Sequence, residues 1–244
     1  MRTSRNTTSK KLVSEAIGTA FLLAAVVGSG IMGEKLAGGN VALALLANTI
    51  STGAALVALI LAFGPISGAH FNPAVTLADA TQGGVPWRVV PAYIVAQCAG
   101  GIMGVYAAHL MFGQQIIQIS QHARSGPAQL LSEFIASFGL LAVIWGCSRA
   151  RLSAVPFAVG AYITAAYWFT ASTSFANPAV TIARSLTNTF SGIRPIDAPG
   201  FIVMQFVGAL AATLLFRWLM PALPETADEL LMPHPKEEIE VQHS

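Results

Sequence analysis

Long apolar runs separated by short polar breaks make up most of the chain. A helix needs about 20 predominantly apolar residues to cross the hydrocarbon core of a bilayer. Two apolar pieces, residues 72–82 and 178–190, have only about half that length. The pattern predicts an all-α membrane protein with six transmembrane helices and two re-entrant half-helices. The six expected transmembrane helices cover residues 12–33, 41–63, 87–111, 128–148, 153–170 and 195–219.

Both half-length pieces begin with the tripeptide Asn-Pro-Ala, within the related strings FNPAVTLA and ANPAVTIA. Asparagine is a good helix N-cap and proline suits the first helical position, so each copy predicts a helix start. Irregular chain at membrane depth survives only where it is buried in protein or lines a wet cavity. The sequence therefore predicts a solute passage at these two motifs. They consist of Asn72, Pro73, Ala74, Asn177, Pro178 and Ala179.

The two halves of the chain repeat one pattern. Glu15 in SEAIGTAFLLA corresponds to Glu133 in SEFIASFGLLA, and Gln97 corresponds to Gln205. Each half has three spans, an odd number, so the second half is inserted upside-down relative to the first. We therefore expect the two half-helices to enter from opposite faces and to direct their N-termini at each other near the midplane.

The composition excludes a soluble protein, because only 10% of the residues are charged and 54% are hydrophobic. A soluble domain carries about 25% charged residues. The sequence has no nucleophile–base pair, no metal-ligand cluster and no phosphate-binding glycine loop, so we expect no enzyme, metal, cofactor or nucleic-acid partner. His109 and His122 are expected at the surface. We expect one channel domain over 1–220, with repeats at about 12–111 and 128–219, and a C-terminal cytoplasmic tail at 221–244.

Lysine and arginine set the expected orientation. With the N-terminus inside, nine of the 13 fall in cytoplasmic segments and four in outer segments. Cytoplasmic loops carry the excess of positive residues in membrane proteins. We therefore expect a multi-pass protein of the inner (plasma) membrane with both termini in the cytoplasm.

Glu15, the string SGAHFNPAVT, Gln97, Glu133 and the second Asn-Pro-Ala together resemble the aquaporin and aquaglyceroporin (major intrinsic protein) family. The resemblance covers about residues 12–219. It implies a homotetramer with one pore per subunit, carrying water or small uncharged solutes passively through the lipid bilayer.

The resemblance also implies roles for individual residues. Asn72 and Asn177 would present amide donors to the pore, at the positive ends of two opposed helix dipoles. Glu15 and Glu133 would hold the loop before each half-helix by accepting its backbone N–H groups, although a proton-relay role is an alternative. His70 is either a pore-facing histidine or a packed, hydrogen-bonded one.

One position departs from the family pattern. The usual arginine directly after the second Asn-Pro-Ala is replaced by Val180. Arg184 lies one helical turn further on, and we expect it not to reach the same ring. Counting from the motifs gives the selectivity filter as Thr52, Tyr167, Ser174 and Val180, with Ala165 as the alternative to Tyr167.

Loss of the arginine widens the expected filter and removes a fixed positive charge. Strict water selectivity depends on a narrow, donor-lined ring. We therefore expect a passive channel for glycerol-like polyols, metalloid hydroxides such as arsenite, methylated arsenicals and some water. Val180 with FANPAVTIAR resembles the AqpS-type bacterial branch, which implies arsenical permeation. The alternative function is a proton-coupled secondary transporter, because inverted repeats and broken helices also occur in that class.

Overall fold

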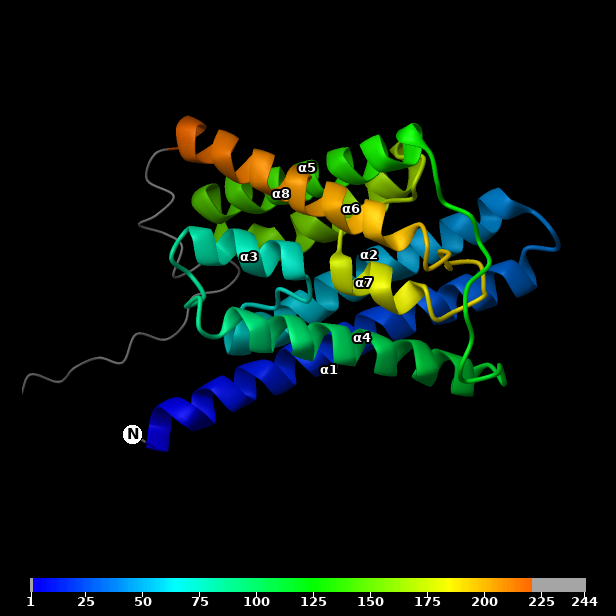
Figure 1. The fold of residues 1–244 in the computed structure, drawn as a ribbon, viewed down its shortest axis with the longest axis horizontal. Helices are drawn as coiled ribbons and strands as arrows, with labels where there is room; N and C mark the ends of the chain where they lie inside the picture. The colour runs from blue at the N-terminus through cyan, green and yellow to red at the C-terminus, as the bar shows by residue number, and fades with distance from the viewer. Residues whose placement is uncertain (1, 221–244) are drawn as a thin grey trace, which may run out of the picture.

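A computed structural model describes the backbone of residues 2–220 and the side chains from residue 8 onward. The C-terminal tail expected at 221–244 lies outside the described residues. Within them every regular element is a helix (Figure 1). In chain order these are α1 (Arg2–Leu36), α2 (Val41–Ser67), α3 (Pro73–Thr81), α4 (Val90–Met111), α5 (Pro127–Ala150), the short 3₁₀ helix η1 (Leu152–Ala154), α6 (Val155–Phe169), α7 (Pro178–Arg184) and α8 (Ala198–Leu219).

Six of these helices are long and apolar enough to cross a membrane, as the sequence predicts. They are α1, α2, α4, α5, α6 together with η1, and α8. The first helix begins at Arg2, so it continues back through most of the basic N-terminal segment. The half-helix expected at 178–190 is shorter than predicted and ends at Arg184. The chain after Arg184 contacts the segment between α4 and α5, where the backbone N–H of Asn188 donates to the side chain of Gln118.

The packing repeats between the two halves. In the first half α1 packs against α2 and α4, and in the second α5 packs against α6 and α8. Each half-helix also contacts a helix of the other half, α3 with α8 and α7 with α4.

Glycine permits the closest contacts between helices. A Cβ atom at Gly104 would lie 2.1 Å from the carbonyl oxygen of Ala20, and one at Gly208 would lie 2.4 Å from that of Phe134. Small residues allow helix backbones to approach closely where lipid supplies no hydrophobic drive between helices.

Figure 1 shows α3 and α7 pointing toward each other from opposite ends of the bundle, with their N-termini meeting midway. The contact between them brings together segments about a hundred residues apart in sequence, as the hydrogen bonds of the site show. The six long helices surround this meeting point. The inverted-repeat architecture expected from the sequence is therefore present.

The segment between α4 and α5 runs along one end of the bundle (Figure 1). Ser120 N–H donates to the carbonyl of Ser185 and Arg194 N–H donates to the carbonyl of His122. His109, expected at the surface, is fully buried here. Its Nδ1 lies 2.8 Å from the carbonyl oxygen of Ile116 and its Nε2 lies 2.8 Å from Thr187 Oγ1. The expectation was wrong because the ring ties the α4–α5 segment to the chain that follows α7.

Candidate functional site

Both half-helices begin with the same cap. Asn72 Oδ1 accepts the backbone N–H of Ala74 at 2.9 Å, and Asn177 Oδ1 accepts that of Ala179 at 2.9 Å. In each case proline follows as the first helical residue. Such side-chain acceptors satisfy amide groups that the first turn of a helix leaves without a partner. The sequence thus dictates where both half-helices start.

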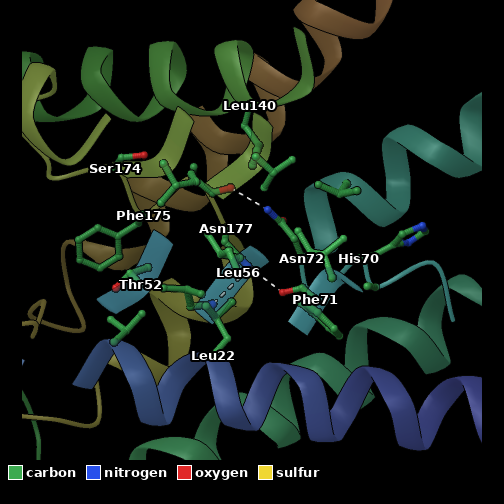
Figure 2. Close-up of a pocket in the computed structure, with 18 of the residues that line it drawn as sticks. Leu22, Thr52, Leu56, His70, Phe71, Asn72, Leu140, Ser174, Phe175 and Asn177 are labelled. Carbon is green, nitrogen blue, oxygen red and sulfur yellow. Dashed lines mark hydrogen bonds between the residues drawn. The ribbon is translucent and has the colours of Figure 1, made fainter. Parts of the chain in front are cut away.

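The two caps are joined by a reciprocal pair of hydrogen bonds. The amide nitrogen of Asn72 donates to the carbonyl oxygen of Ala176 at 2.8 Å, and that of Asn177 donates to the carbonyl oxygen of Phe71 at 2.8 Å (Figure 2). Each carbonyl belongs to the residue that precedes the other asparagine. This arrangement fixes the two amides at one level of the bundle, where both residues line the same cavity.

The loops before the half-helices have an unusual backbone. Ala69, Phe71, Ser174 and Ala176 all have φ of 49°, in the left-handed region. Non-glycine residues there cost of the order of 1–3 kcal/mol each unless their surroundings hold them. In each loop one residue without a positive φ, His70 or Phe175, separates two of these left-handed residues. Such an alternation turns successive N–H groups toward one side, where they can bind an anion.

A buried carboxylate occupies that position in each half. Glu15 accepts the backbone N–H groups of His70 at 3.0 Å and Phe71 at 2.7 Å. Glu133 accepts those of Phe175 and Ala176, both at 2.9 Å. These hydrogen bonds compensate the strain of the loops.

Two glutamines complete the support. Gln97 donates to Glu15 at 2.8 Å and to Thr76 Oγ1 at 2.9 Å. Gln205 donates to Glu133 at 2.6 Å and to Thr181 Oγ1 at 2.8 Å. The glutamine of the last span in each half therefore connects the carboxylate to the first turn of that half-helix.

The cavity is lined by two chemically different groups of residues. Its empty volume, open ends included, is about 650 Å³. One group consists of the loops before the half-helices, from Ala69 to Asn72 and from Ser174 to Asn177. The other group is aliphatic and comes from equivalent positions of the two halves: Leu22, Val26, Leu56 and Ile60 from the first, and Leu140, Ile144, Val159 and Ile163 from the second. Figure 2 shows Leu22, Leu56 and Leu140 around the two asparagines.

All four residues expected in the filter line this cavity, namely Thr52, Tyr167, Ser174 and Val180. The hydroxyl of Tyr167 donates to Thr52 Oγ1 at 3.3 Å. Tyr167 is buried, whereas Ala165, its alternative, is exposed on the other side of α6. Of the two alternatives, the structure therefore places Tyr167 at the cavity.

Arg184 also lines the cavity. Its guanidinium lies over the ring of Phe175, 3.4 Å from the ring centroid, and its Nε donates to the carbonyl of Ser191. Helical side chains lean back toward the N-terminus, and a long arginine can span the 5.4 Å rise of one turn. That Arg184 does not reach the filter ring itself remains an expectation.

Phe175 is a cavity residue that the sequence reading missed. Its ring is almost fully buried and packs edge-on against Phe201, with centroids 5.3 Å apart. The guanidinium of Arg124, from the segment before α5, lies 5.1 Å from the same ring and donates to the carbonyls of Gly192 and Ser172. A single aromatic residue in a loop gives no periodic signal by which it could be found.

His70 lines the cavity at the α3 end (Figure 2). Its Nδ1 lies 3.1 Å from Thr76 Oγ1, so it is both a cavity residue and a hydrogen-bonded one. Asp79, which the sequence reading also missed, lies 3.7 Å from its Nε2. A carboxylate inside an apolar half-helix is a signal that could have found it.

Comparison with known proteins agrees with this geometry. The model of the major intrinsic protein family matches residues 2–155 and 147–242. The aquaglyceroporin AqpS of Rhizobium meliloti (strain 1021) is 57% identical over 216 residues, which cover 88% of this chain and 92% of that protein. The aquaporin NIP1-3 of Oryza sativa subsp. japonica is 37% identical over 184 residues, covering 72% of this chain and 63% of that protein.

Among solved structures, the aquaglyceroporin from Plasmodium falciparum matches with a TM-score of 0.71 over 88% of this chain and 98% of that chain. The sequence identity is 19%, so this match supports the fold alone. The members of this family are channels and not enzymes. The chain, with its two capped half-helices meeting at one cavity, belongs to the major intrinsic protein family of aquaporins and aquaglyceroporins.

Proposed function

We propose that this chain is a passive channel for small uncharged solutes: glycerol-like polyols, metalloid hydroxides such as arsenite, methylated arsenicals and some water. The observation that carries the proposal is the reciprocal bonding of Asn72 and Asn177 at a cavity that is also lined by aliphatic side chains. The N-termini of two helices then direct their positive ends at one point. That field opposes cations, while the amides offer donors to a solute oxygen.

The filter accounts for the proposed solute range. Val180 is small and apolar at the position where the family usually has arginine, and Thr52 is smaller than an aromatic residue. We propose that Arg184 supplies a guanidinium to this ring from one turn further on, supported on Phe175. Because its Nε is already bonded to Ser191, the group is held against the wall and leaves the ring wide. The relative at 57% identity is named as an aquaglyceroporin, which supports solutes larger than water.

We further propose a homotetramer in the inner membrane with both termini in the cytoplasm. The distribution of lysine and arginine supports this orientation. In it, α3 lies on the cytoplasmic side and α7 on the outer side. The exposed apolar side chains of the long helices, among them Val95, Met103, Val203 and Leu210, suit lipid or neighbouring subunits.

The bonding of the two buried carboxylates supports a channel over a proton-coupled transporter. Glu15 and Glu133 both accept backbone N–H groups of the loops that they hold. Neither residue is among those that line the cavity. A carboxylate with these structural donors is poorly placed to exchange protons with a passing solute.

Stopped-flow measurements on the purified protein in liposomes test the proposed solute class. We expect glycerol, urea and arsenite to permeate well above the rate of empty liposomes, with water permeation alongside. Water flux without any glycerol or arsenite flux would contradict the wide filter. Absence of all flux would contradict the open passage.

A further inference from the structure

A buried carboxylate faces the histidine at the α3 end of the cavity. Asp79, in the second turn of α3, has its Oδ2 3.7 Å from Nε2 of His70. Both residues are buried: Asp79 exposes 3% of its surface and His70 exposes 7%. The same Oδ2 accepts the backbone N–H of Val85 at 2.6 Å, a hydrogen bond that favours the ionised carboxylate. In the second half-helix the position of Asp79 is held by Arg184 and that of His70 by Phe175, so the pseudo-symmetry repeats the contact but not its chemistry.

The hydrogen bonds around Thr76 bear on where His70 carries a proton. The hydroxyl of Thr76 lies 3.0 Å from the carbonyl oxygen of Asn72, which can accept its proton. The same hydroxyl oxygen accepts an N–H of Gln97 at 2.9 Å. While its proton is on the Asn72 carbonyl, this oxygen meets Nδ1 of His70 at 3.1 Å as an acceptor, and Nδ1 carries a hydrogen. A hydroxyl turned toward Nδ1 would instead leave the hydrogen of a neutral ring on Nε2, which faces Asp79.

A neutral ring protonated on Nδ1 would direct the lone pair of Nε2 at a carboxylate. A second proton on Nε2 replaces that repulsion by an attraction between opposite charges. Two further groups lie beside His70. From α1, the Glu15 carboxylate accepts the backbone N–H of His70. From α4, the Tyr93 ring lies 5.7 Å away and its hydroxyl donates to the carbonyl of Ser67.

We propose that Asp79 is a positioning residue that holds His70 as an imidazolium in the wall of the cavity. The ion pair places a fixed positive charge at the α3 end, separate from the two asparagine amides and from Arg184 at the α7 end. Its consequence for transport rests on the proposed channel function. The charge is a further barrier to cations, and it is lost at alkaline pH when His70 gives up its second proton.

The protonation of His70 can be measured directly. The full chain, labelled with ¹⁵N-histidine in lipid nanodiscs, is titrated by NMR, with His70 assigned from the signals that disappear in His70→Gln. We expect both ring nitrogens of His70 to remain protonated at pH 7.5, where an ordinary imidazole with a pKa of about 6.5 is mostly neutral. In Asp79→Asn we expect His70 to lose its second proton at a pH lower by about one unit or more. This corresponds to an affinity of His70 for that proton about tenfold weaker or more. Asp79→Glu retains the wild-type signature, and the control Glu34→Gln, an exposed carboxylate, leaves it unchanged.

A neutral His70 at pH 7.5 in the wild-type protein would overturn the proposal. An unchanged titration in Asp79→Asn would also overturn it. Potassium leak from proteoliposomes is the second readout. Asp79→Asn and His70→Gln should raise the leak equally, and the double variant should raise it no further. Additive increases in the double variant would contradict the proposal that Asp79 acts through His70. If the spectra are as expected but no solute permeates, the channel function fails and the ion pair stands.

Discussion

The guanidinium of Arg184 lies against the ring of Phe175, 3.4 Å from its centroid, at the edge of the cavity. A cation over an aromatic face is stabilised by about 0.5–2 kcal/mol, depending on how far it is desolvated. Here the contact also fixes the position of the positive charge of Arg184. Val180, Phe175 and Arg184 all line the cavity, and the arginine is the last residue of α7.

Val180→Arg should lower glycerol and arsenite permeability by about tenfold, equivalent to roughly 1.4 kcal/mol in the barrier. The new side chain narrows the ring and adds donors to it. Stopped-flow light scattering measures the effect, and Val180→Leu serves as a control for added volume without charge. Unchanged permeability in the arginine variant would show that Val180 does not belong to the filter.

Arg184→Gln should leave glycerol permeability within about twofold of wild type and raise potassium leak severalfold, because a fixed positive charge at the constriction opposes cations. Dye-based leak assays in proteoliposomes measure this change. Arg194→Gln is the matched control, since Arg194 pairs with Asp197 and does not line the cavity. Equal leak in the two variants would argue that Arg184 contributes only packing.

Glu133→Gln should destabilise the protein and abolish flux together. The carboxylate accepts two backbone N–H groups and the amide of Gln205, and glutamine would turn an N–H₂ group toward some of these donors. An unsatisfied buried donor costs about 1–3 kcal/mol. Thermal unfolding in detergent is the measurement, with Glu34→Gln as control. A fully stable variant that loses only coupling to a pH gradient would favour the transporter instead.

Gly104→Val should separate α1 from α4, because even a Cβ atom at this position would lie 2.1 Å from the carbonyl oxygen of Ala20. Overpacking of this kind costs about 1–3 kcal/mol or more. We expect a lower yield of folded protein and a lower unfolding temperature. Gly146→Ala is the control, since the nearest atom to its added Cβ would be 3.6 Å away. Equal stability of the two variants would refute the role of Gly104 in close packing.

Much of the fold follows from the sequence because its determinants are local. Each transmembrane helix is a long apolar run, and each half-helix begins at an asparagine followed by a proline. The end of α7 could not be predicted in the same way. Contacts with the end of α4 and with the segment after it hold the chain beyond Arg184 in a different conformation.

The candidate site was predictable where residues repeat between the halves. Glu15 and Glu133, or Asn72 and Asn177, occur in matched strings, and the structure gives each pair matched partners. Phe175, Arg124 and Asp79 are not repeated as the same residue in the other half. Their relevance depends on three-dimensional neighbours: the reach of Arg184, the path of the α4–α5 segment and the position of the His70 ring.

The most direct test of passive conduction is glycerol uptake into proteoliposomes with and without an imposed pH gradient. A passage between two opposed half-helices gives uptake that rises linearly with glycerol concentration, stops at equal concentrations on both sides and is unaffected by the gradient. Accumulation of glycerol above the external concentration when the pH gradient is applied would contradict a passive channel.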